Sequence, residues 1–142
     1  MNRRRIICVG NSLVTADAVG HLVHDELRSR NLGDSFEVLD GGLAGLDLLP
    51  FFDGCEVMVL VDRVVGFADP GSVVRLDAAR LDEVWTEAYS HSGGLLYLLK
   101  TLPHLGLDPL PKVWLIGIEG EGEAETIKRA ADMAVEAANA LV

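Results

Sequence analysis

Cysteine, basic residues and long apolar runs are all scarce in this sequence of 142 residues. The two cysteines, Cys8 and Cys55, are too few for a disulfide scaffold and fit a reducing compartment. Lys and Arg number 12 against 22 Asp and Glu, which gives a formal net charge of −10. Nucleic-acid binders need a basic face that displaces counterions, so this balance argues against one. No run approaches the roughly 20 apolar residues of a membrane span.

The chain does contain enough apolar side chains for one folded domain. Hydrophobic residues make up 49% of the sequence, and the length is typical of a single domain. We therefore expect one domain over residues 1–142, in a cytoplasmic protein. The basic residues at 3–5 and the small residues at 16–18 resemble a signal peptide. However, Gly10 interrupts the apolar stretch after four residues, and cleavage would remove a core strand.

Short apolar runs alternate with segments of helical periodicity along the chain. Five consecutive apolar residues at 57–61 indicate a strand that is buried on both faces of a sheet. The leucines at 95, 98, 99 and 102 have the spacing of one buried helix face. The same reasoning predicts five strands, at residues 5–9, 36–39, 57–61, 72–76 and 113–118. It also predicts four helices, at residues 17–30, at 44–49 with an end at Pro50, at 91–102, and at the C-terminus with an apolar face along 127–141.

This order of elements predicts a three-layer αβα sandwich. Alternating strands and helices favour a five-stranded, mostly parallel sheet with right-handed crossovers. Too few residues separate the strand at 72–76 from the strand before it for a helical crossover, so this short strand can run antiparallel.

Polar residues follow the predicted strands at the carboxyl edge of the sheet, where open α/β folds bind ligands. The first strand leads through Ser12 to Asp17, the second ends at Asp40, and the third ends at Asp62. The loop before the leucine-striped helix supplies His91. Two carboxylates and an imidazole could converge on this edge and form a mixed oxygen and nitrogen metal site.

Each of these residues also has a structural interpretation. Asp17 could cap a helix, Asp62 could pair with the neighbouring Arg63, and a histidine at a helix start, such as His91, is most often solvated or capping. An acid that follows five apolar residues is costly unless its charge is solvated or used, which favours a functional role for Asp62.

Other features carry weaker functional signals. His21 and His24 stand beside Asp25, which is compatible with a chelating pair but more typical of a solvated helix face. Residues 10–13, Gly-Asn-Ser-Leu, are similar to the Gly-Asp-Ser-Leu block of a lipase and esterase family with a serine nucleophile. That chemistry usually takes its histidine from an Asp-x-x-His near the C-terminus, and this sequence has none.

Four short motifs lie in order along the chain. They are Gly10-Asn11-x-Leu13-x-x-x-Asp17-x-x-Gly20, Asp40-Gly41-Gly42-x-x-Gly45-x-x-Leu48-Leu49, Val61-Asp62 and Ser90-His91-x-x-Gly94-Leu95. Any one of them is weak, but together, in register over most of the chain, they resemble the endopeptidases that mature the large subunit of nickel–iron hydrogenases. One departure is Ala16, which stands where the family often has an acid.

The resemblance implies a phosphorylase/hydrolase-like fold and a cytoplasmic, monomeric, aspartyl-type endopeptidase. Its substrate would be the large-subunit precursor of a nickel–iron hydrogenase, which loses a C-terminal extension after nickel insertion. The resemblance implies that Asp17, Asp62 and His91 contact the nickel carried by the substrate, a site that other divalent cations could occupy, and that they serve in catalysis. The backbone at Asp40, Gly41 and Gly42 could lie close to the extended tail. The alternative is a catalytically silent α/β binding or accessory module.

Overall fold

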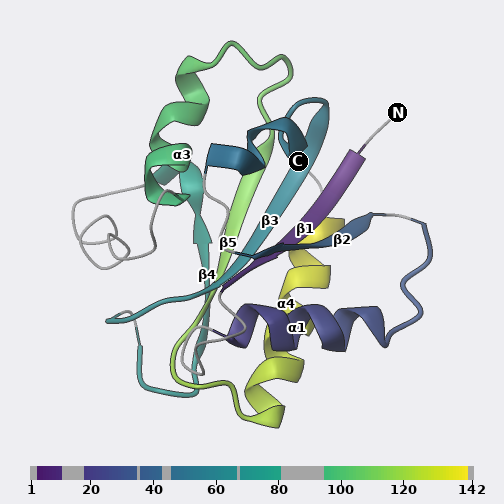
Figure 1. Ribbon diagram of the computed structural model, residues 1–142, viewed down its shortest axis with the longest axis vertical. Coiled ribbons are helices and arrows are strands. Elements are labelled where there is room, and N and C mark those ends of the chain that lie inside the picture. The colour runs from purple at the N-terminus through teal and green to yellow at the C-terminus, as the bar shows by residue number, and fades with distance from the viewer. Residues whose placement is uncertain are drawn as a thin grey trace.

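A five-stranded sheet forms the middle layer of the molecule (Figure 1). The computed structural model describes residues 3–10, 18–34, 36–42, 46–66, 68–80 and 95–140. Its strands are β1 (Arg3–Val9), β2 (Glu37–Gly42), β3 (Cys55–Arg63), β4 (Val73–Asp77) and β5 (Lys112–Ile118). Across the sheet the order is β2-β1-β3-β5-β4, with every pair parallel except β4 and β5. The mostly parallel sheet with one short antiparallel strand is therefore confirmed.

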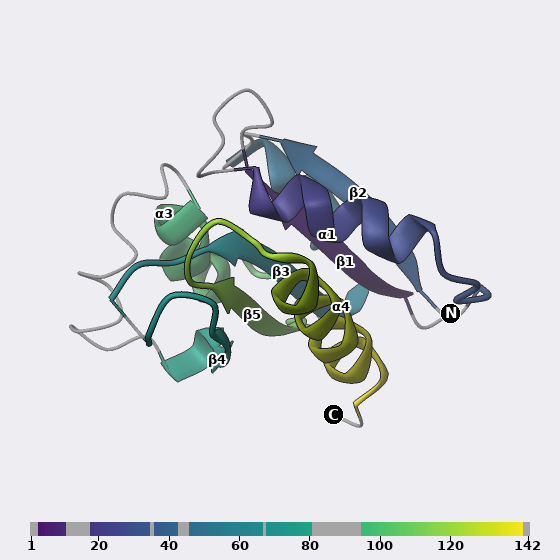
Figure 2. The same cartoon turned by 90° about the horizontal axis from the view of Figure 1, so that it is seen from below.

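Helices cover both faces of this sheet (Figure 2). One face packs against α1 (Val19–Arg28) and α4 (Ala124–Asn139). The other packs against α3 (Leu95–Thr101) and the 3-10 helices η2 (Leu46–Phe51) and η4 (Leu102–His104), while η3 (Ala78–Arg80) follows β4. The predicted three-layer αβα sandwich is confirmed. Within the described ranges, no helix is long and apolar enough to cross a bilayer.

Side chains of β3 alternate between the two cores. Val57, Val59 and Val61 belong to the core under α1 and α4. Met58 and Leu60 belong to the core under α3. All five are fully buried, which explains why the strand is a continuous apolar run in the sequence.

Two element boundaries differ from the prediction for physical reasons. β2 was expected to end at Leu39 but continues to Gly42, because a bulge lets Gly42 pair with Val9 of β1. Pro50 was expected to end the second helix but lies inside η2. The backbone φ that proline imposes suits a 3-10 helix, so the proline is accommodated there. The predicted starts of the helices at 17 and 91 lie outside the described residues, and α1 is described from Val19 with Ala18 at its N-cap.

Gly20 determines how closely α1 approaches β1. A Cβ atom on Gly20 would lie 2.0 Å from the carbonyl oxygen of Val9 and 2.8 Å from its carbonyl carbon. Because non-bonded atoms do not approach so closely, only glycine fits at this position. The glycine of the first sequence motif therefore has a packing role, which brings the start of α1 against the carboxyl end of β1.

We expect Gly20→Ala to lower the free energy of unfolding by about 2 to 3 kcal/mol, because the added methyl group must displace α1. In a helix without this contact, the same change would be favourable by about 1 kcal/mol. Gly33→Ala is the matched control: φ is +72° there, but no atom lies within 4 Å of the added Cβ. Its cost is that of the backbone conformation, about 1 kcal/mol. Urea unfolding measures both, and equal losses would contradict the packing role of Gly20.

Candidate functional site

Asp62 lies near the end of the central strand, at the carboxyl edge of the sheet. The residue is only 7% exposed and pairs with Gly117 of β5. One carboxylate oxygen, Oδ1, accepts a hydrogen bond from the backbone N–H of Arg63 at 2.8 Å. Strand alternation places the side chain of Asp62 on the same face as Met58 and Leu60, which is the face covered by α3. The acid that follows the apolar run therefore lies at the expected edge of the sheet, and the structure shows that it is buried.

Asp17 and His91, the other two predicted nickel-contacting residues, lie outside the described residues, as does Ser12. Before Asp17 the described chain stops at Gly10, which directly follows β1, the neighbour of β3, and after His91 it resumes at Leu95, where α3 begins. Among the residues that the structure does describe, no three His, Cys, Asp or Glu side chains are grouped so as to hold a metal ion.

Residues 40–42 form a bulge at the end of β2. Cys8 pairs with Asp40 and Val9 pairs with Gly42, so that Gly41 is the extra residue. Oδ1 of Asp40 accepts a hydrogen bond from the backbone N–H of Gly42 at 3.0 Å. An aspartate that binds the backbone two residues further on is a common turn-forming contact. The Asp40 carboxylate therefore holds the bulge that follows it.

Glycine is favoured at positions 41 and 42 of this bulge for two different structural reasons. A Cβ on Gly41 would lie 2.7 Å from a methyl carbon of Ile7 and 3.3 Å from one of Leu48. Gly42 adopts φ +55°, a backbone conformation that favours glycine. The carbonyl of Gly42 also accepts a hydrogen bond from the N–H of Gly10 at 2.8 Å. The bulge is thus joined to the segment that leaves β1.

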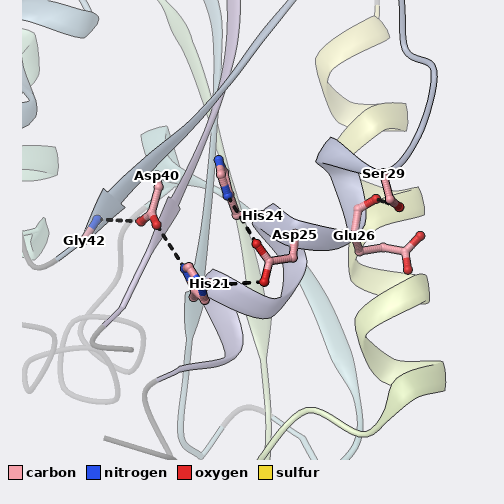
Figure 3. Close-up of polar contacts among 7 residues, drawn as sticks. All are labelled: His21, His24, Asp25, Glu26, Ser29, Asp40 and Gly42. Carbon is pink, nitrogen blue, oxygen red and sulfur yellow. Dashed lines mark hydrogen bonds and ion pairs between the residues drawn. The ribbon is translucent and has the colours of Figure 1, made fainter. Parts of the chain in front are cut away.

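His21 of α1 reaches the same bulge (Figure 3). Its Nδ1 lies 3.0 Å from Oδ2 of Asp40, and its Nε2 lies 3.6 Å from Oδ2 of Asp25. The rings of His21 and His24 stack, with centroids 6.3 Å apart and planes inclined at 21°. The sequence prediction missed the contact with Asp40, because only the spacing of four residues to Asp25 is visible locally. Asp40 lies on the α1 face of the sheet, and Asp62 lies on the α3 face.

Contacts at the bulge lower the pKa of Asp40 below that of an ordinary aspartate. Partial burial acts in the opposite direction, but the hydrogen bonds from Gly42 and His21 and the charges of His24 and His21 favour the ionised carboxylate. The pKa of the Cys8 thiol is raised, first by burial and then by the Asp40 charge. Both cysteines are free and buried, as small apolar core residues often are.

Comparison with known proteins places the chain among peptidases. Residues 21–141 match the hydrogenase maturation protease family. Hydrogenase 2 maturation protease of Escherichia coli (strain K12) is 32% identical over 116 residues, which cover 80% of this chain and 70% of that protein. The structure of the hydrogenase maturating endopeptidase HybD from E. coli is similar with a TM-score of 0.70 and 28% identity, covering 96% of this chain and 88% of that chain.

A more distant structure has the same fold. The [NiFe] hydrogenase maturation protease HybD from Thermococcus kodakarensis is 23% identical, with a TM-score of 0.62 over 96% of this chain and 95% of that chain. The fold and these likenesses define a peptidase of the hydrolase class. The chain belongs to the hydrogenase maturation protease family, which confirms the resemblance of the four sequence motifs.

The lowered pKa of Asp40 predicts an acid-sensitive contribution to stability. A carboxylate with a lowered folded-state pKa stabilises the fold fully above its ordinary pKa of about 4, and this contribution is lost as the pH falls through the lowered value. Between about pH 5 and pH 2, we expect the free energy of unfolding to fall more in the wild type than in Asp40→Asn. The difference should stay below about 1 kcal/mol, because the side chain is 37% exposed. Urea unfolding across this range measures it, and identical acid dependence in the two proteins would contradict the assignment.

Proposed function

We propose that this peptidase removes a C-terminal extension from the large-subunit precursor of a nickel–iron hydrogenase, after nickel has been inserted. Membership of the hydrogenase maturation protease family supports this substrate class. The observation that carries the proposal is Asp62, a buried carboxylate at the carboxyl edge of the central strand. Burial of a charged group is costly, and open α/β folds bind ligands at the carboxyl edge of the sheet, so the place of Asp62 favours a functional role. The enzyme would act as a monomer in the cytoplasm.

In this proposal Asp17, Asp62 and His91 contact the nickel that the precursor carries. Carboxylate oxygen and imidazole nitrogen both suit this metal, which belongs to the substrate. The topology supports the grouping in two ways. First, β1 is the neighbour of β3 and leads into the segment with Asp17. Second, α3 follows His91 in the chain and covers the face of the sheet on which Asp62 lies. Three separate segments would thereby meet at one edge of the sheet.

The same carboxylates would serve in hydrolysis of the peptide bond. Contact with the substrate's nickel would hold the scissile bond beside Asp17 and Asp62. A carboxylate in that place can accept a proton from the water that attacks the carbonyl carbon, and can return a proton to the amine that leaves. The backbone of residues 40–42 would bind the extended tail, since glycines let another chain approach closely.

Nickel in the precursor should decide whether cleavage occurs. We expect incubation with nickel-loaded precursor to yield a large subunit shortened by its C-terminal extension, whereas nickel-free precursor stays intact, because the enzyme would recognise the metal. Intact mass measurement of both reactions distinguishes the two products. Equal cleavage of the two precursors would contradict nickel recognition while leaving the peptidase activity in place.

Substitution of the proposed nickel-contacting residues should abolish processing without unfolding the protein. We expect Asp62→Asn and His91→Ala to lower the processing rate by at least about a hundredfold, since each removes a metal-contacting or proton-accepting group. Asn at position 62 still offers an oxygen to the backbone N–H of Arg63, so the strand should remain folded. Asp53→Asn, at an exposed carboxylate, is the control for loss of one charge. Wild-type rates in either variant, with unchanged circular dichroism, would remove that residue from the mechanism.

A further inference from the structure

A chain of polar contacts joins α1, through the bulge, to the residue that follows β1. Figure 3 shows its first two contacts, from His21 to Asp40 and from Asp40 to Gly42. His21 contacts Oδ2 of Asp40, Oδ1 of the same carboxylate accepts the N–H of Gly42, and the carbonyl of Gly42 accepts the N–H of Gly10. Both oxygens of Asp40 are therefore engaged, one by the helix and the other by the bulge. Gly10 directly precedes residues 11–17, which include Asp17, so this chain of contacts leads to the segment proposed to touch the nickel.

We propose that His21 is a positioning residue for substrate binding: by holding Asp40 it fixes the backbone of Gly41 and Gly42, along which the precursor's tail lies. This inference rests on the proposed function, which assigns the tail to the bulge. His21 acts through Asp40 rather than on the scissile bond.

His21 lies between two carboxylates. Its Nδ1 is within hydrogen-bonding distance of Asp40 Oδ2, at 3.0 Å, whereas its Nε2 is 3.6 Å from Asp25 Oδ2, which is a longer ion-pair distance. The contact with Asp40 is therefore the closer of the two. The stacked ring of His24 lies alongside, and the thiol of Cys8 on β1 is a further titratable group that interacts with Asp40.

Gly42 is a residue whose conformation such an anchor can hold. Glycine visits positive and negative φ with similar ease, and at φ +55° its N–H and carbonyl are hydrogen-bonded to Asp40 and Gly10. Without His21, the Asp40 side chain is freer to leave the Gly42 N–H, and the bulge samples other conformations. A binding surface that must be ordered by its ligand binds more weakly, so the effect should fall on KM rather than on kcat.

The effect should be modest, because the His21 and Asp40 side chains are 40% and 37% exposed and water screens their interaction. Loss of an exposed ion pair of this kind changes an equilibrium constant, here that of substrate binding, by about fivefold at most. High salt should weaken the contact further, since exposed charges are screened.

The test compares the wild type with three variants. His21→Leu removes the donor, His21→Asn keeps an N–H close to the position of Nδ1, and Asp25→Asn removes the other partner of His21 but not its contact with Asp40. Each protein is assayed for kcat and KM with nickel-loaded precursor. Independently of activity, NMR follows the titration of the Asp40 carboxyl carbon and the hydrogen exchange of the Gly42 amide.

We expect His21→Leu to raise KM by about three- to fivefold with kcat within about twofold, and to speed exchange of the Gly42 amide by a similar factor. The pKa of Asp40 should rise in the same variant, because a hydrogen bond to its ionised form is lost. His21→Asn should restore most of each property, and Asp25→Asn should stay close to the wild type.

Three results would overturn the inference while the wild type remains active. They are unchanged KM and Gly42 exchange in His21→Leu, a fall in kcat without a rise in KM, or an equal loss in Asp25→Asn. Failure of the proposed function has a different signature, since the wild type itself then leaves the loaded precursor intact. In that case the tail-binding role of His21 is refuted together with it.

Discussion

Burial of β3 on both faces of the sheet is the constraint on which the rest of the structure depends. Its alternate side chains enter two separate cores, and a shift of one residue would exchange the two sets, so the register of the strand is fixed. That register places Asp62 at the carboxyl edge, opposite Gly117. A Cβ on Gly117 would lie 2.8 Å from a methyl carbon of Val64, so the glycine lets the chain beyond Asp62 pack closely against β5. The position of the acid is thus a consequence of core packing.

Close packing of α1 on β1 builds the second part of the site. Gly20 lets the start of the helix touch the carbonyl of Val9, and the next residue, His21, then lies within hydrogen-bonding distance of Asp40. The bulge that Asp40 holds is in turn joined to Gly10. Glycines of the sequence motifs therefore act at contacts between backbone segments, where a side chain would not fit or the φ angle is positive.

Local periodicity was sufficient to predict the order of the elements, and the short separation between the third and fourth strands allowed an antiparallel β4. Features that depend on contacts between distant segments were not predictable in this way. The continuation of β2 to Gly42 depends on its pairing with β1, and the contact of His21 with Asp40 joins residues 19 apart in sequence. A functional role for Asp62 was predicted from the cost of an acid after an apolar run, and this role remains a prediction. The grouping of Asp17 and His91 with Asp62 came from the family resemblance as well as from the carboxyl-edge rule, and it also remains a prediction.

The most direct test of the proposal that the enzyme recognises the precursor's nickel is to measure which ligands coordinate that nickel. X-ray absorption at the nickel edge can be recorded for the loaded precursor alone and for its complex with the enzyme, frozen before cleavage. We predict that the nickel gains oxygen and nitrogen ligands in the complex, and that the gain is reduced when the enzyme carries Asp62→Asn. A nickel spectrum that is the same with and without the enzyme, in a complex shown to have formed, would contradict recognition of the metal by these side chains.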